Sequence, residues 1–149
     1  MGMRAMLIAA VVFGTTPASL IAAPPSALDA PIKPSTPTLG SEIKRGESAV
    51  FQCSTDYDST LQFQSFARCV DDQELANRNE MKSGYEAYDT GLYFAARTYA
   101  QITLNVLSEH SVPAVGVQEM INAFDIGYHE NSKAFHLTDE QVRIAAFGK

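Results

Sequence analysis

The chain has 149 residues, a formal net charge of −6, 46% hydrophobic residues, two cysteines and three histidines. Its basic residues are scattered singly except for Lys44 with Arg45, whereas nucleic-acid binding depends on clustered Lys and Arg side chains that contact phosphates. Nucleic acid is therefore not an expected partner, and the acidic balance favours solubility without indicating a fold.

The first 22 residues have the layout of a secretory signal peptide. Arg4 precedes an apolar run over residues 5–13, which is about half as long as the roughly 20 residues that a spanning helix needs. Cleavage is predicted after Ala22, with an uncleaved membrane anchor as the alternative, and the large Leu20 leaves the site open. Cleavage removes Arg4 and no acid, so the formal charge changes from −6 to −7. The expected location is the periplasm or the exterior, without stable membrane insertion.

Residues 23–47 are predicted to form a proline-rich, flexible and disordered tether. Their prolines lie among Ser, Thr, Ala and Gly, a composition that buries too little apolar surface to offset the entropy lost on ordering. A docking peptide is the alternative, but the pair Pro31 and Pro34 lacks flanking basic and aromatic residues. Residues 48–149 are expected to form one helical domain.

The first part of this domain contains both a weak strand signal and a helical face. Residues 49–53, AVFQC, have the composition of a strand, which is thin support for a sheet. Farther along, Ser59 is a candidate N-cap for a helix whose apolar face is made by Phe63, Phe66, Ala67 and Val70.

The strongest periodic signal predicts a long helix from Ser83 to Glu109. Ser83 and Glu86 have the spacing of a capping box, and Pro113 follows soon after the end. A stripe with steps of three and four is expected to be the core face: Tyr85, Tyr88, Leu92, Ala95, Tyr99, Ile102 and Val106. Small residues would allow a neighbouring helix to approach closely: Gly91, Ala95, Ala96 and Ala100.

Two further helices are predicted near the C-terminus. One has an apolar face made by Val117, Ile121, Phe124 and Tyr128. The other begins after Thr138, with Gln141 at the reciprocal position of a capping box. The domain is therefore predicted to be all-α, a small bundle of about four helices.

Cys53 and Cys69 are predicted to form one disulfide that staples this bundle. Their separation of sixteen positions matches neither the two-residue gap of redox pairs nor a four-ligand zinc site. In an exported protein such a pair forms a structural bond, worth about 3 kcal/mol for a loop of this size. Free thiols or a bond between chains are the alternatives.

The histidines offer the first candidates for catalysis or metal binding. His129, Glu130 and His136 lie close in sequence, but zincin chemistry needs histidines four positions apart on a helix, and here the gap is seven. A solvated loop is expected there instead. No catalytic residue, metal or cofactor is assigned, and a metal-binding protein or hydrolase using these three residues is an alternative function.

A second set of candidates lies on the long helix. Tyr93 lies to the side of the core stripe, with Thr90 and Arg97 at helical neighbour spacing. Tyrosine is favoured in interfaces because its body is apolar and its tip polar. The three residues are the predicted contact with a protein or cell-envelope partner, while a half-buried packing role for the tyrosine is the alternative.

The favoured functional prediction is an exported, small helical interaction protein of unknown specificity, because no catalytic constellation is found. A carrier is the third possibility, with a small apolar ligand held between helices. The residues that would hold it serve equally well as a plain core: Phe63, Phe66, Tyr99 and Phe124.

Overall fold

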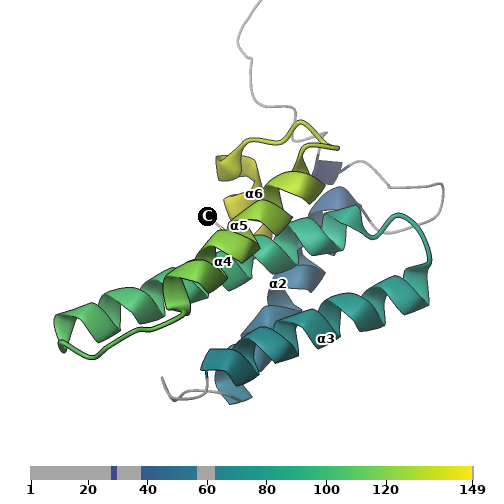
Figure 1. Ribbon diagram of the computed structural model, residues 1–149. Helices are drawn as coiled ribbons and strands as arrows, with labels where there is room; N and C mark the ends of the chain where they lie inside the picture. Colours follow the sequence, from purple (N-terminus) through teal and green to yellow (C-terminus); the bar gives the residue numbers. More distant parts are fainter. Residues whose placement is uncertain (1–27, 30–37, 57–62, 149) are drawn as a thin grey trace, which may run out of the picture. The chain divides into compact units, whose positions relative to one another are not determined.

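The computed structural model describes residues 28–29, 38–56 and 63–148, and all contacts given below lie within the compact unit 31–149. The expected signal peptide lies outside the described residues, as does the candidate cap Ser59. Five helices make up the described part of this unit (Figure 1): α2 (Leu39–Asp56), α3 (Phe63–Met81), α4 (Glu86–Glu109), α5 (Val117–Ser132) and α6 (Asp139–Phe147). The predicted all-α class and stapled bundle are confirmed, with α2 as an additional helix.

Helix α2 corrects the expected boundary between tether and domain at residue 48. It begins at Leu39, and the Oγ1 atom of Thr38 accepts a hydrogen bond of 3.1 Å from the Ser41 backbone N–H. Its buried uncharged positions recur in steps of three and four: Leu39, Ile43, Gly46, Val50 and Cys53. The central position of this stripe is a glycine, so the apolar pattern is interrupted in the sequence. The strand composition of residues 49–53 is likewise misleading, because they are helical.

Backbone contact between α2 and α4 explains that glycine. A Cβ atom on Gly46 would lie 2.1 Å from the Tyr88 carbonyl oxygen, and one on Gly91 would lie 1.9 Å from the Ile43 carbonyl oxygen. Both distances are far below van der Waals contact, so only glycine lets the helices cross this closely. The close approach predicted at Gly91 is confirmed, and its partner is Gly46.

Helix α4 is central because it contacts each of the other four helices. Almost every residue from 87 to 96 is buried, so this half of the helix is covered on most sides. The predicted capping box of Ser83 and Glu86 is wrong. The helix N-cap is Tyr85, which makes no side-chain capping hydrogen bond, and the turn before it depends on Gly84 at φ 76°.

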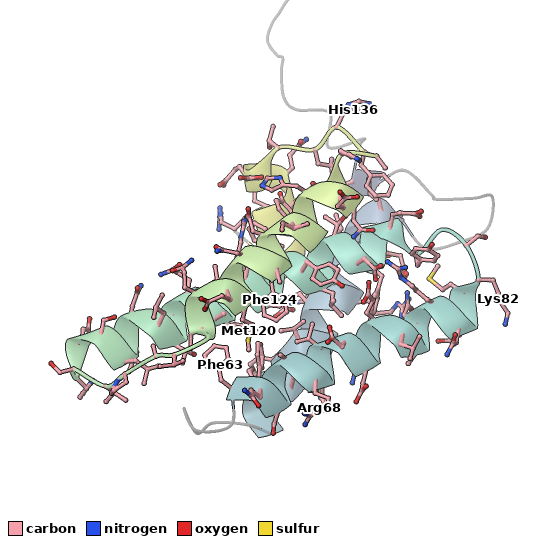
Figure 2. All side chains as sticks on the ribbon, viewed as in Figure 1. Phe63, Arg68, Lys82, Met120, Phe124 and His136 are labelled. Atoms are coloured by element: carbon pink, nitrogen blue, oxygen red, sulfur yellow. A yellow bond between two sulfur atoms is a disulfide. The ribbon has the colours of Figure 1, made fainter. Side chains whose placement is uncertain are left out.

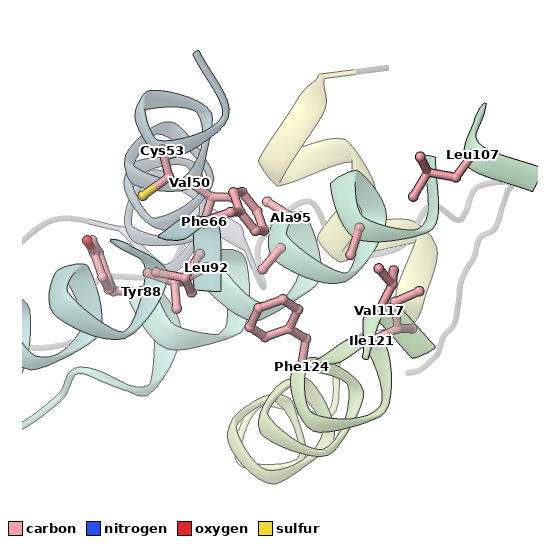
Figure 3. Close-up of a cluster of buried hydrophobic side chains, with 13 residues drawn as sticks. Val50, Cys53, Phe66, Tyr88, Leu92, Ala95, Leu107, Val117, Ile121 and Phe124 are labelled. Carbon is pink, nitrogen blue, oxygen red and sulfur yellow. The ribbon is translucent and has the colours of Figure 1, made fainter. Parts of the chain in front are cut away.

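The predicted stripe of α4 divides into two halves. Tyr88, Leu92 and Ala95 are buried in the main apolar cluster (Figure 3), as expected. Ile102 and Val106 are 53% and 44% exposed, so the expectation that they belong to the core is wrong. The physical reason is that burial depends on covering helices, and these positions lie where α4 is no longer covered on that side.

The predicted disulfide is confirmed, since Cys53 and Cys69 are bonded with their Cα atoms 5.8 Å apart. The bond joins α2 to α3, so Cys53 lies on a helix and not on a strand or turn. On α3, Phe66 and Val70 are buried, which confirms the predicted apolar face.

Helices α5 and α6 follow their sequence signals. The four predicted positions of α5 are all buried: Val117, Ile121, Phe124 and Tyr128. At the start of α6, the Gln141 backbone N–H donates to Thr138 Oγ1 at 3.1 Å, and the Thr138 backbone N–H donates to Gln141 Oε1 at 2.9 Å. The predicted capping box is therefore confirmed.

Candidate interaction surface

Of the three residues predicted to contact a partner, Thr90 is fully buried. Its hydroxyl group donates a hydrogen bond of 2.8 Å to the carbonyl oxygen of Glu86, one helical turn earlier. A partner cannot reach this side chain, so the prediction is wrong for Thr90. Helical spacing places Thr90 beside the core stripe of α4, on a side that is expected to face solvent. This half of α4 is covered on most sides by other helices, so that side is buried as well.

Tyr93 is half-buried between α4 and α5. Its ring centroid lies 6.3 Å from that of Phe124, and a Cβ atom on Gly127 would lie only 2.8 Å from its ring. Burial raises the pKa of Tyr93 well above the usual tyrosine range, and the nearby Glu74 carboxylate adds to this increase. The alternative that this tyrosine packs within the unit therefore agrees with its contacts.

Arg97 joins α4 to α5 at the surface. Its Nη1 atom donates to Asp125 Oδ1 at 2.5 Å, and its guanidinium carbon lies 4.7 Å from the Tyr128 ring centroid. The side chain is 23% exposed, so part of it remains accessible. Among the three predicted residues, Arg97 is the one that borders the surface described below.

The histidine candidates are spread over two elements. His129 and Glu130 are exposed residues of α5 and not of a loop, whereas His136 lies in the turn before α6 and points away from the helices (Figure 2). His129 Nε2 lies 3.5 Å from Asp125 Oδ1. Across the described ranges, no group of three or more His, Cys, Asp or Glu side chains is placed to hold a metal ion.

The four aromatic residues considered for a carrier all belong to or pack on the main apolar cluster. The Phe66 ring centroid lies 5.9 Å from that of Phe63 and 6.2 Å from that of Phe124, and Figure 3 shows Phe66 and Phe124 within this cluster. Tyr99 also donates a hydrogen bond of 2.9 Å to Glu47 Oε2. The contacts of these side chains are therefore those of core packing.

An ion pair between a partly exposed arginine and a buried carboxylate joins α3 to α4. Asp89 is fully buried, and its Oδ2 atom accepts hydrogen bonds of 3.2 and 3.0 Å from Nε and Nη2 of Arg78. Its Oδ1 atom accepts none from the described part of the chain. Burial raises the pKa of Asp89 to about 7, although the hydrogen bonds from Arg78 act in the opposite direction. This carboxyl group therefore titrates near neutral pH.

A second polar contact joins α2 to the same end of α3. Arg45 Nη2 donates to Asn77 Oδ1 at 2.6 Å and to Glu42 Oε1 at 2.7 Å, while its guanidinium carbon lies 4.5 Å from the Tyr88 ring centroid. Glu42 and Asn77 are both buried. The second half of α3 is thus held by polar contacts, whereas its first half is held by the disulfide and apolar packing.

We call the surface of residues 98–118 the hairpin end. It consists of the second half of α4, the segment after it and the first residues of α5. In Figure 1, α4 runs here beyond the other helices. Half of the exposed large apolar side chains in the described chain lie in this short range: Ile102, Val106, Val112 and Val115. Residues 98–118 contain no Lys, Arg or Asp, and their single Glu is Glu109. The hairpin end therefore combines exposed apolar side chains with uncharged polar ones and carries little charge.

A groove of about 340 Å³ lies between α4 and α5 at the base of the hairpin end. Ile102 and Ile121 supply apolar surface to it, and the ion pair between Arg97 and Asp125 is part of its lining. The remaining lining residues are uncharged and polar: Thr98, Gln101 and Asn122. Exposed apolar side chains beside an open groove are typical of a site that binds another molecule.

Comparisons with protein-family models, with curated proteins and with solved structures each found no match to this chain. Within the described residues, no helix has both the length and the apolar character needed to cross a membrane.

Sequence reasoning assigns the residues of the hairpin end to the wrong place or to none. Ile102 and Val106 continue the spacing of a buried stripe, and Val112 and Val115 lie in a segment without periodicity. The available signal is the lack of charge between Arg97 and Glu109, because a surface helix usually carries charged residues opposite its apolar stripe.

Proposed function

We propose that this chain is an exported helical interaction protein that binds a protein partner of the cell envelope or the exterior through its hairpin end. The observation that carries the proposal is the exposure of Ile102 and Val106, which continue the stripe by which α4 packs against its own neighbours. Apolar residues on a helix that no other helix covers favour burial against another molecule.

Export is supported by two independent features. The disulfide between Cys53 and Cys69 is typical of proteins that fold in an oxidising compartment, and Arg4 with the apolar run after it has the layout of a signal peptide. Binding of a protein is supported by the net charge of −6, which disfavours nucleic acid.

The two alternative functions gain no support from the positions of their residues. His129 and Glu130 lie on α5, while His136 lies in the following turn. Within the described ranges, these three residues do not form a metal site with one another or with other His, Cys, Asp or Glu residues. The phenylalanines proposed for a carrier fill the core, and Tyr99 packs on the same cluster while its hydroxyl group donates to Glu47.

Capture of partners from envelope extract tests the proposal, with immobilised protein and three variants. Ile102→Glu and Val106→Glu place a charge on the hairpin end, whereas Leu75→Glu places one at a 60% exposed position of α3. We expect the first two variants to lose the captured protein and the third to retain it, while all keep the same circular dichroism spectrum. Equal capture by all three would contradict the hairpin end as the binding surface.

A further inference from the structure

We infer that the partner of the hairpin end is a second copy of this chain, an inference that rests on the proposed function and names its partner. The distribution of charge favours a second copy. Two copies of an acidic chain repel each other wherever their charged surfaces meet. The hairpin end has one carboxylate, Glu109, and no Lys or Arg, so two copies can meet there with little like-charge repulsion.

The shape of the uncovered surface favours a helix as its occupant. Helix α2 covers the α4 stripe at Tyr88 and Leu92, where Gly46 lets it approach closely. The same stripe continues to Ile102 and Val106 without cover. Since helical ridges pack into the grooves of another helix, the uncovered half of α4 best fits a helix, and the uncovered half of a second α4 presents matching spacing.

The polar side chains beside the stripe include paired carboxamides. Gln101 Nε2 donates to Asn105 Oδ1 at 3.0 Å, and Gln118 Nε2 donates to Asn122 Oδ1 at 3.0 Å. Each carboxamide both donates and accepts hydrogen bonds, so a row of carboxamides is complementary to an identical row. Charged side chains at the same positions would require a partner of opposite sign, whereas carboxamides permit a partner of the same sequence.

A two-fold arrangement follows from the order of these features along the hairpin end. The groove lies at Ile102, the exposed tip at Val115, and Val106 lies on α4 between them. In an antiparallel pair, the tip of each copy therefore lies over the groove of the other, and Val106 lies near the two-fold axis. Such an interface is isologous and closes at the dimer.

Sedimentation equilibrium of the purified chain tests this inference. We expect a monomer–dimer equilibrium with a dissociation constant in the range of about 1 to 100 μM. Val106→Glu should weaken dimerisation at least about tenfold, because it buries two like charges near the axis, whereas Leu75→Glu should not change it. Val106→Cys provides a second measurement, since both native cysteines are already bonded. Mild oxidation should link it into a covalent dimer, and Leu75→Cys should remain monomeric.

Each other outcome overturns the inference. A chain that stays monomeric, yet captures a different protein in a way that Ile102→Glu abolishes, retains the proposed function but not the second copy as partner. Hairpin-dependent binding to phosphatidylcholine vesicles by a monomer rejects the second copy in favour of lipid. Absence of both dimerisation and hairpin-dependent capture rejects the inference and the proposed function together.

Discussion

The Tyr99 hydroxyl group on α4 donates a hydrogen bond of 2.9 Å to the Glu47 carboxylate on α2. Glu47 is buried and also accepts a hydrogen bond of 2.8 Å from Lys44 Nζ, which in turn donates to the carbonyl oxygen of Ala146 on α6. One phenol therefore ends a polar network that connects three helices.

Replacing Tyr99 with phenylalanine should lower the free energy of unfolding by about 1 kcal/mol, since one hydrogen bond to a buried carboxylate is lost. Tyr99→Ala should cost about 3 kcal/mol, because the ring contact with Phe147, at a centroid distance of 6.0 Å, is lost as well. Urea denaturation followed by circular dichroism measures both. Equal stability of Tyr99→Phe and the original chain would mean that the hydrogen bond contributes nothing.

Alanine at Gly46 or Gly91 should destabilise the fold by several kcal/mol. Ordinarily, Gly→Ala within a helix stabilises it by about 1 kcal/mol. Here the new methyl group would overlap a carbonyl oxygen of the crossing helix, so α2 and α4 must separate. Ser48→Ala, at an exposed position of α2, is the matched control and should be neutral or stabilising. Thermal melts that place all three variants together would contradict the close crossing.

Asp89 should make the protein less stable as the pH rises. Its pKa is about 7 in the folded chain against an ordinary value of 3.8, so between these values the folded chain holds a proton that the unfolded chain releases. The free energy of unfolding therefore decreases through this interval, by at most about 1.4 kcal/mol per pH unit. The stabilisation from the proton on Asp89 is complete below pH 3.8 and is lost above about pH 7. The charged groups that act on Asp89 are Arg78, Glu74 and Glu86.

Urea denaturation at several pH values, repeated with Asp89→Asn, measures this contribution as the difference between the two profiles. The asparagine cannot ionise, so Asp89→Asn should remove the decrease in the free energy of unfolding with rising pH. Asp72→Asn, at an exposed position of α3, should leave that decrease in place. Parallel profiles for the original chain and Asp89→Asn would show that the buried carboxyl group does not titrate in this interval.

Reduction of the disulfide should lower the free energy of unfolding by about 3 kcal/mol, because the unfolded chain regains the freedom of a sixteen-residue loop. Denaturation with and without reductant gives the value, and peptide mapping of unreduced protein should recover Cys53 linked to Cys69. In the double variant Cys53→Ala and Cys69→Ala, reductant should have no effect. If reductant lowered the free energy of unfolding of that variant by a similar amount, its effect would not come from the disulfide.

Tyr93→Ala should destabilise the fold about as much as Tyr99→Ala, by about 3 kcal/mol, because the Tyr93 ring packs against Phe124 and Gly127. Tyr93→Phe keeps this packing but loses the hydrogen bond to the Glu74 carboxylate, so it should cost only about 1 kcal/mol. Thermal melts of both variants distinguish this packing role from a surface role. An unchanged melting temperature for Tyr93→Ala would return the side chain to the candidates for partner contact.

Local signals in the sequence determined most of the helices and the disulfide. The start of α6 was predictable because Thr138 and Gln141 form their hydrogen bonds within one turn. The faces of α3 and α5 were predictable because apolar residues repeat at helical spacing there. Two cysteines in the chain allow one intrachain pairing, and Cys53 with Cys69 forms it.

Tertiary structure alone decided which helical faces are covered, because periodicity identifies a face of a helix but not its neighbour. Ile102 follows the same spacing as Leu92, yet only Leu92 lies beneath another helix. Gly46 has no apolar side chain, so its place in the α2 stripe depends on the backbone of α4, which is distant in sequence. Asp89 resembles any other surface acid until α3 packs over it, and its burial then shifts its protonation toward neutral pH.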